Sequence, residues 1–442
     1  MPKTRDQVKK EYVWSTEDVF SSLDDWSASF DATLNKIDFA RFMGKLGDGD
    51  CAYEYCKAAD EIECEIGKLY IYAHMKHDED SRNSTYTSLM MKMNELFVKY
   101  SQATAFVLPE LTSLDEATLK AYIADPRFSD YDYMLKTILK DKPHVLSAEC
   151  EELLALGGKV FGGFSEIFGM LDNADMTFGE VEVDGETVKL SHGTYGVLLA
   201  HPDQKVREKA FKTYYKSYIS HINTLSQVYV GNVNKDVFFA RARKYKSCLD
   251  KALSGEDVSE IVYKNLLEAV EGALPIMHEY IRERKKVLGV SELHMYDLHT
   301  PLVEGAELKL DFEDAFKLVK EGLKPLGEEY IKLLDRAKSE RWMDVEETEG
   351  ERSGAYSTGV YGIKHPYVLL NYQPTTHDVF TIAHELGHAM HTYHSNLNQP
   401  QAKADYKIFV AEVASTVNEV LLLKHVLKTC EDVKLKKYLL SY

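Results

Sequence analysis

Apolar residues recur at intervals of three and four positions over most of this chain, which is the period of an α-helix with one buried face. The pattern runs with almost no proline from about Trp26 to Leu139. It returns in four later segments, Glu151–Leu171, Gln204–Ala240, Ser259–Leu288 and Phe312–Ala337. Segments of roughly 20 to 35 residues exceed the usual length of a globular helix. The pattern therefore predicts a mainly α-helical protein with long antiparallel helices.

Two stretches break the helical period. Residues 180–190 alternate around Asp184-Gly185, a dipeptide typical of a hairpin turn. We place a domain boundary there, which gives an N-terminal helical domain over 1–190 and a catalytic domain over 191–442. The second break, from Trp342 to Tyr372, is rich in Gly, Ser and Tyr, and its likeliest strand is 367–372. A short β element beside a helical body usually marks a cleft.

Charge and composition exclude some classes of function. The 442 residues include 53 Lys plus Arg and 71 Asp plus Glu, a formal net charge of −18. Such an acidic surface repels phosphate backbones, which argues against nucleic acid as a partner. The start of the chain lacks the apolar core of a signal peptide, and no stretch reaches the roughly 18 uncharged apolar residues of a membrane span. Six scattered cysteines fit free thiols in a reducing compartment. We expect a cytoplasmic protein with no membrane partner.

The segment from Thr375 to His391 contains the chemical motif His384-Glu385-Leu-Gly-His388. On a helix the two histidines lie about 40° apart, so both imidazoles can converge on one metal ion. Glu385 lies on the flank, where it can act as a general base. Apolar side chains occupy the opposite side of this helix: Val379, Ile382, Leu386 and Met390. The segment is therefore predicted to be an HExxH metal-binding helix with a buried back.

A catalytic zinc needs a third protein ligand, and two residues compete for that role. His394 has the metzincin spacing, but that pattern requires glycine at the position that His391 occupies. Glu412 follows His388 by 24 residues, in a second predicted helix that also carries Glu419 on the same face. Two carboxylates in so apolar a helix are explained if Glu412 binds the metal and Glu419 supports a histidine ligand. We therefore predict Glu412 as the third ligand, with Glu419 and His391 beside the ligands.

Several runs along the chain together indicate a family. They are Tyr12-Val-Trp-Ser-Thr-Glu-Asp-Val-Phe20, Lys324-Pro-Leu-Gly-Glu-Glu-Tyr330, Glu351-Arg-Ser-Gly-Ala-Tyr356, His365-Pro-Tyr-Val-Leu-Leu-Asn371, His384-Glu-Leu-Gly-His388-Ala-Met-His391, Asn398-Gln-Pro400 and Phe409-Val-Ala-Glu-Val-Ala-Ser-Thr-Val-Asn-Glu419. These runs closely resemble oligoendopeptidase F, a bacterial relative of thimet oligopeptidase. The resemblance implies a large helical shell around a deep cleft that admits short peptides, with a small β element beside the HExxH helix. It also implies that Gly354, Ala355 and Tyr356 offer backbone groups to an extended substrate. Such relatives continue past the Glu412 helix, so the chain resembles a C-terminally truncated member.

The sequence thus predicts a zinc endopeptidase with one Zn²⁺ per chain and short peptides as substrates. The first alternative is a catalytically impaired peptide-binding fragment, which keeps the zinc site but lacks the C-terminal wall of the cleft. The second is a structural helical protein with an accidental HExxH sequence. Oligomeric state, cleavage preference and the oxyanion-stabilising groups do not follow from the sequence.

Overall fold

The computed structural model describes residues 3–303 and 305–441. Its contacts divide the chain into two compact units. The first unit joins Met1–Lys142 with Glu307–Lys436, and the second joins Pro143–Ala306 with Lys437–Tyr442. The fold is mainly α-helical, as predicted. The predicted domain division at residue 190 falls inside the second unit, directly after a β-hairpin, and remains a prediction.

The N-terminal part of the first unit is a layered helical body. Its helices are α1 (Leu23–Lys36), α2 (Gly49–Glu79), α3 (Ser84–Thr104), α4 (Val107–Ser113), α5 (Glu116–Ala124) and α6 (Asp132–Asp141). Side chains start the long helices: Asp48 accepts the backbone N–H of Cys51 at α2, and Asn83 accepts that of Thr85 at α3. Trp26 is fully buried in the core of this body and donates its indole N–H to the carbonyl of Leu69.

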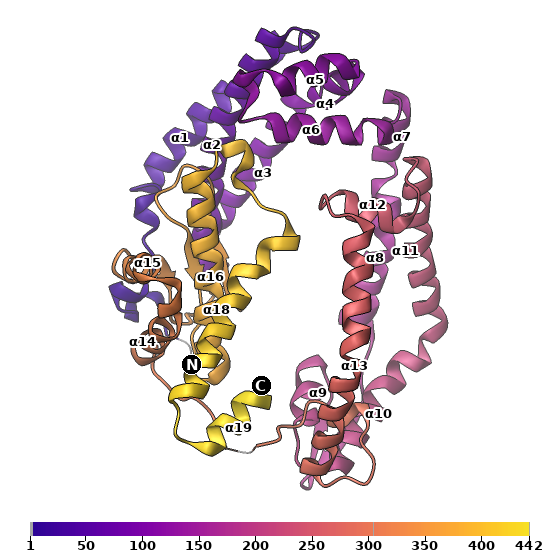
Figure 1. The fold of residues 1–442 in the computed structure, drawn as a ribbon, viewed down its shortest axis with the longest axis vertical. Helices are drawn as coiled ribbons and strands as arrows, with labels where there is room; N and C mark the ends of the chain where they lie inside the picture. Colours follow the sequence, from indigo (N-terminus) through magenta and orange to yellow (C-terminus); the bar gives the residue numbers. More distant parts are fainter. Residues whose placement is uncertain (1–2, 304, 442) are drawn as a thin grey trace. The chain divides into compact units, whose positions relative to one another are not determined.

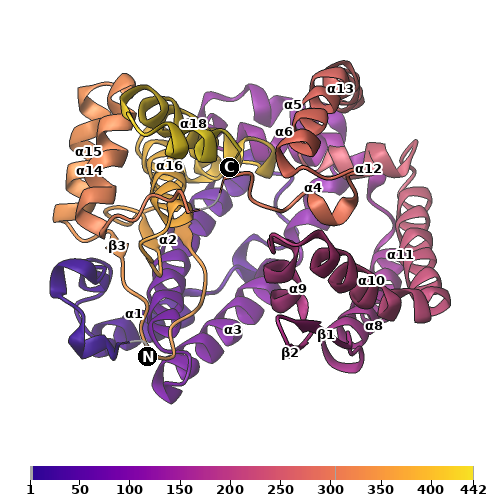
Figure 2. The ribbon, with the colours of Figure 1, turned by 90° about the horizontal axis from the view of Figure 1, so that it is seen from below.

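The C-terminal part of the first unit carries the predicted motif. Its elements are α14 (Phe312–Leu323), α15 (Glu328–Ser339), β3 (Met343–Asp344), β4 (Tyr356–Thr358), β5 (Tyr367–Leu369), α16 (Thr376–Asn398), α17 (Gln401–Ala404) and α18 (Ile408–Thr429). The division between the two units falls inside the next helix, α19 (Val433–Ser441), after Lys436. The single helix predicted over 312–337 is two helices, because Pro325 and Gly327, at a φ of 97°, end α14 and restart the chain. Figure 1 shows α16 and α18 side by side in yellow, and Figure 2 shows the same pair from below.

The small sheet in this unit has the strand order β3-β5-β4. Strand β3 is parallel to β5, and β4 is antiparallel to β5 with Ser357 opposite Val368. The predicted strand at 367–372 is thus present as β5, which is fully buried. Among the residues that the structure describes, strand β4 pairs on one side only, so its other edge is available for a further strand.

A buried charge cluster joins the start of the chain to this sheet. Arg5 forms ion pairs with the buried carboxylates of Asp344 and Glu79. Glu351, in the loop before β4, accepts hydrogen bonds from the backbone N–H and hydroxyl of Thr348, both at 2.7 Å. Burial, with the nearby charge of Asp344, raises the pKa of Glu351 to about 7. The cluster therefore holds more carboxylates than one guanidinium can neutralise.

The second unit is a smaller helical body. Its elements are α7 (Ala148–Leu156), α8 (Gly158–Met170), the π-helical turn η7 (Leu171–Asp175), β1 (Glu180–Val183), β2 (Glu186–Lys189), α9 (His192–Leu199), α10 (Gln204–Ser220), α11 (Ile222–Ala242), α12 (Cys248–Ser254) and α13 (Glu260–Leu288). The predicted hairpin is confirmed, with Asp184-Gly185 as the two turn residues between β1 and β2. Both adopt the positive φ that such a turn requires. The helical stretch Glu149–Asp175 is long and apolar enough, by length and composition alone, to cross a membrane.

Candidate metal centre

Helix α16 presents the two motif histidines from a firmly packed element. The Thr375 hydroxyl caps its first turn by accepting the backbone N–H of Asp378 at 3.1 Å. Its apolar back is buried through Val379, Ile382, Leu386 and Met390. His384 and His388 lie one turn apart on the opposite face and stay partly exposed. The local fold thus follows from the predicted amphipathic pattern.

Three donor atoms converge in front of this face. Nε2 of His384 and Nε2 of His388 lie 3.1 Å apart. The Oε2 atom of Glu412 lies 3.4 Å from the first nitrogen and 3.3 Å from the second. Ligand atoms around a tetrahedral zinc ion, with bonds of about 2.0–2.1 Å, lie about 3.3 Å from one another. The spacing of the three donors therefore fits one small divalent cation.

Close contact between two helices brings Glu412 to this position. A Cβ added at Gly387 would lie 2.7 Å from the Cα of Ser415 on α18, so only glycine fits at this crossing. Asn418 is buried on α18 and donates its amide to the carbonyl of Ala383 on α16, at 2.9 Å. The Ser415 hydroxyl donates to Oε2 of Glu412 at 2.8 Å. These contacts fix the carboxylate relative to the two imidazoles.

Glu419 and His391 occupy different positions near the triad. Oε1 of Glu419 lies 2.5 Å from Nδ1 of His384, the nitrogen that faces away from the other donors. A proton on Nδ1 leaves the lone pair of Nε2 free for a metal. His391 stacks on Tyr406 with ring centroids 3.8 Å apart and lies outside the donor group. His394 is exposed and is also outside that group.

Glu385 lies on the flank of the histidine face, between α16 and β4. Its side chain is buried, and its carboxylate lies near the backbone N–H of Ser357. Burial raises the pKa of Glu385 to about 7, with the charge of Glu412 adding to the rise and that of His384 opposing it. A carboxyl group that titrates near neutrality can both accept and return a proton.

The backbone segment predicted to meet substrate leads into the free edge of β4. Gly354 adopts a φ of 87°, and its carbonyl accepts the amide of Asn371 at 2.7 Å. The Tyr356 hydroxyl donates to the buried carboxylate of Asp78 at 2.7 Å. Ala355 lies between these two anchored residues. Hydrogen bonds to Asn371 and Asp78 therefore fix the start of the edge strand beside Glu385.

Sequence reasoning missed three residues that shape the site: Gly387, Asn418 and Asp78. A signal was present for the first two. Gly387 is the one glycine inside the motif helix, and Asn418 is an amide in an otherwise apolar run. Asp78 lies about 300 residues before the motif in the chain, so only the folded structure connects it to Tyr356.

Comparisons with known proteins show which family the chain resembles. Residues 197–440 match the profile of peptidase family M3, and residues 110–178 match that of oligopeptidase F. Oligopeptidase PepF of Bacillus subtilis (strain 168) is 41% identical over 99% of this chain. A proposed peptidase from Chlamydophila abortus superposes with a TM-score of 0.93 at 30% identity, over 100% of this chain and 75% of that one. Oligoendopeptidase F of Enterococcus faecium superposes with a TM-score of 0.62 at 30% identity, over 96% of this chain and 70% of that one.

These matches, together with the mainly helical fold, place the chain in a class of metallopeptidases. More narrowly, the chain belongs to peptidase family M3, and it is similar to the oligoendopeptidases F within it. The chain spans 66% of the length of the Bacillus subtilis protein.

Proposed function

We propose that this chain binds one zinc ion through His384, His388 and Glu412, and hydrolyses internal bonds of short peptides with Glu385 as general base. The observation that carries the proposal is the set of three donor atoms 3.1 to 3.4 Å apart beside a buried glutamate. Burial also lowers the pKa of His388, which favours the neutral imidazole that binds metals.

The chain's own residues supply the proton transfers. Zinc bound at this site would polarise the scissile carbonyl and lower the pKa of water from 15.7 towards roughly 7. Glu385, on the flank of the site, takes the proton from the attacking water and later gives it to the leaving amine. Glu419 keeps the Nδ1 proton of His384 in place, so that Nε2 faces the centre.

The free edge of β4 supports a peptide as the substrate. An extended peptide can add to this edge through backbone hydrogen bonds, which bring it beside Glu385 with little dependence on side chains. Gly354, Ala355 and Tyr356 are the residues we assign to this contact. Its side-chain tolerance fits an enzyme for mixed short peptides.

The test is turnover of internally quenched peptides by the metal-free, zinc-loaded and Glu385→Gln forms of the full chain. Zinc should bind at about one ion per chain and switch on cleavage at internal bonds. Glu385→Gln should keep the zinc and lose cleavage. If the chain binds no stoichiometric zinc, the HExxH sequence is accidental and the alternative of a structural helical protein is correct.

A second candidate function is peptide binding with little turnover. It is favoured by the exposure of the α18 side chains that neighbour Glu412, with Val413 58% and Val417 43% exposed. A cleft open on that side would bind a peptide without excluding water. Stoichiometric zinc and measurable peptide affinity, together with negligible cleavage, would identify this candidate.

The predicted cytoplasmic location also remains part of the proposal. All six cysteines are free thiols in the structure, which is usual in a reducing compartment. Fractionation of the native host, with detection of the protein in the cytoplasmic fraction, tests this assignment.

A further inference from the structure

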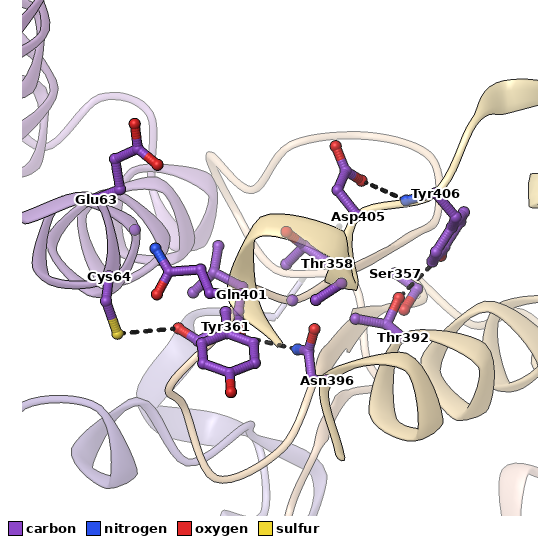
Figure 3. A pocket seen from close by; sticks show the side chains of 14 residues that line it. Glu63, Cys64, Ser357, Thr358, Tyr361, Thr392, Asn396, Gln401, Asp405 and Tyr406 are labelled. Atoms are coloured by element: carbon purple, nitrogen blue, oxygen red, sulfur yellow. Dashed lines mark hydrogen bonds between the residues drawn. The ribbon is translucent and has the colours of Figure 1, made fainter. Parts of the chain in front are cut away.

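A cavity of about 480 Å³ lies along the continuation of strand β4 in the first unit. Figure 3 shows it between Glu63 and Cys64 of α2 on one side and Asp405 and Tyr406 on the other. Its remaining walls are the β4 edge with the loop that follows, over 357–361, and one face of α16. The metal centre does not use these residues.

The cavity lies on the path that a bound peptide would follow. Thr392 and Asn396 line it and follow His388 along α16 at steps of four residues, each of which turns about 40° around the helix axis. The backbone N–H of Ser357 lies near the carboxylate of Glu385, and Ser357 also lines the cavity. Asn396 donates its amide to the carbonyl of Val360 at 3.0 Å, which ties the strand to the helix beyond that point. The edge of β4 therefore leads from the general base into the cavity.

The ionisable groups on this lining favour a cation. Among the lining residues that the structure describes there are two carboxylates, on Glu63 and Asp405, and no lysine, arginine or histidine. Glu63 accepts the hydroxyl of Tyr100 at 2.5 Å, and Asp405 accepts its neighbour's backbone N–H at 2.9 Å. Within residues 3–303 and 305–441 neither carboxylate is placed in an ion pair.

Two lysines on the same helices are paired with acids outside the cavity lining. Lys68 of α2 pairs with Glu65 at 2.8 Å, and Lys403 of α17 pairs with Asp132 at 2.6 Å. A further polar atom, the hydroxyl oxygen of Ser357, is buried with no hydrogen-bond partner in the described part of the chain. The cavity therefore offers uncompensated negative charge and an unused hydroxyl to a ligand.

We propose that this cavity binds the positively charged amino end of the peptide substrate. The inference rests on the proposed peptidase function and adds an orientation to it. Antiparallel pairing is the more stable arrangement per residue, and it directs the amino end of a peptide on β4 towards residues 358–361. The opposite orientation would bring a carboxylate terminus against Glu63 and Asp405.

The geometry also gives the reach of this contact. Asn396 follows His388 by eight residues, which is about 12 Å along the axis of α16. An extended peptide covers about 12 Å with three to four residues. The amino group is therefore recognised about three to four residues before the bond that is cleaved, and the cavity limits the peptide on that side.

The experiment measures binding rather than turnover. Zinc-loaded full-length protein carrying Glu385→Gln is titrated with a fluorescent peptide that lacks Lys and Arg, in free, N-acetylated and C-amidated forms. Acetylation should raise Kd about 3- to 10-fold, whereas amidation should change it little. Glu63→Gln combined with Asp405→Asn should bring the acetylation ratio close to one. Glu61→Gln, an exposed acid two residues from Glu63 and outside the cavity lining, should leave the ratio unchanged.

Two further binding measurements test whether the contact is electrostatic and whether it needs the terminal amino group. The acetylation ratio should shrink as NaCl is raised from about 0.05 to 0.5 M, since it is electrostatic, and this arm needs no variant that must fold. An acetylated peptide that begins with lysine and binds as tightly as the free form would support ammonium recognition and show that a side chain can supply it. Three outcomes would overturn the proposal. The parent could show an acetylation ratio of one, or the ratio could stay unchanged when both carboxylates are removed. Amidation could also change Kd more than acetylation does. Absence of cleavage by the zinc-loaded parent would count against the peptidase function, while the binding ratios still decide the role of the cavity.

Discussion

Nδ1 of His384 lies 2.5 Å from Oε1 of Glu419, while Nε2 of the same ring lies 3.4 Å from Oε2 of Glu412. Both carboxylates come from helix α18, two turns apart, so one helix contacts both nitrogens of one imidazole. The arrangement fixes the tautomer and the plane of the ring together. The candidate metal centre is therefore a property of the packed pair α16–α18 rather than of the HExxH helix alone.

Replacing the third ligand should release the metal. Glu412→Gln removes the charged donor and should strongly weaken zinc retention through gel filtration, measured by elemental analysis. His394→Ala is the matched control, because His394 is exposed and lies outside the donor group, and it should retain about one zinc per chain. The reverse outcome would assign the third ligand to His394.

Loss of the orienting carboxylate should have a smaller effect. Glu419→Gln keeps the size of the side chain but removes the negative charge beside Nδ1 of His384. We expect zinc affinity to fall by about 10- to 100-fold, measured by competition with a chromogenic chelator. Equal affinity of Glu419→Gln and the parent would show that the contact does not support the ligand.

The general base can be separated from the ligands. Glu385→Gln should leave zinc content and thermal unfolding near those of the parent and should lower kcat for peptide cleavage by about 10²- to 10⁴-fold. Steady-state cleavage of a quenched peptide provides the measurement. Near-normal kcat in this variant would remove Glu385 from the mechanism.

The helix crossing should tolerate no added side chain. In Gly387→Ala the new methyl group meets backbone atoms of Ser415 and Ala414 at 2.7 to 2.9 Å, so α18 must move away. We expect a loss of about 1–3 kcal/mol in the free energy of unfolding, together with weaker zinc retention. Gly272→Ala on α13 is the control: no atom of the described residues lies within 4 Å of its added Cβ, and the change should be neutral or stabilising by up to about 1 kcal/mol. Similar behaviour of the two variants in thermal unfolding would contradict the close crossing.

The buried charge cluster should make stability depend on pH. The pKa of Glu351 rises from its ordinary value of 4.5 to about 7 on folding, so the folded protein binds more protons than the unfolded chain between these values. Stability is thus favoured by the neutral carboxyl below pH 4.5 and is lost as pH rises through 7.

Glu351→Gln should remove this pH-dependent loss. After allowance for partial exposure, the variant should be about 1–2 kcal/mol more stable than the parent at pH 8, with little difference near pH 4.5. Denaturant unfolding at both pH values measures it. Glu347 is an exposed acid in the same loop, and Glu347→Gln should leave the difference in stability between the two pH values as it is in the parent. If Glu351→Gln and the parent differ in free energy of unfolding by the same amount at both pH values, titration of Glu351 is not the cause.

The sequence predicted the helical class, the hairpin at Asp184-Gly185 and strand β5, because each has a strong local period or turn signal. It did not predict the break at Pro325 and Gly327, since the apolar period continues through it. The candidate ligands followed from spacing on two helices. The contact of Gly387 with Ser415, the Asn418 amide and the cavity beyond Thr358 depend on how distant segments pack, which periodicity does not encode.

The first unit is assembled from two stretches of chain that flank Pro143–Ala306. Trp14 packs on Tyr367, and the backbone N–H of Ser15 donates to the carbonyl of Arg341. Residues near the start of this chain therefore find their packing partners only after more than three hundred further residues have been synthesised. At about 5–20 residues per second, a ribosome needs roughly 20–80 s to pass from Trp14 to Glu412. A nascent chain therefore lacks the proposed third donor when the earlier stretch of the first unit has already been made. The proposed hydrolytic centre is thus completed only after both stretches of this unit have been translated and can pack together.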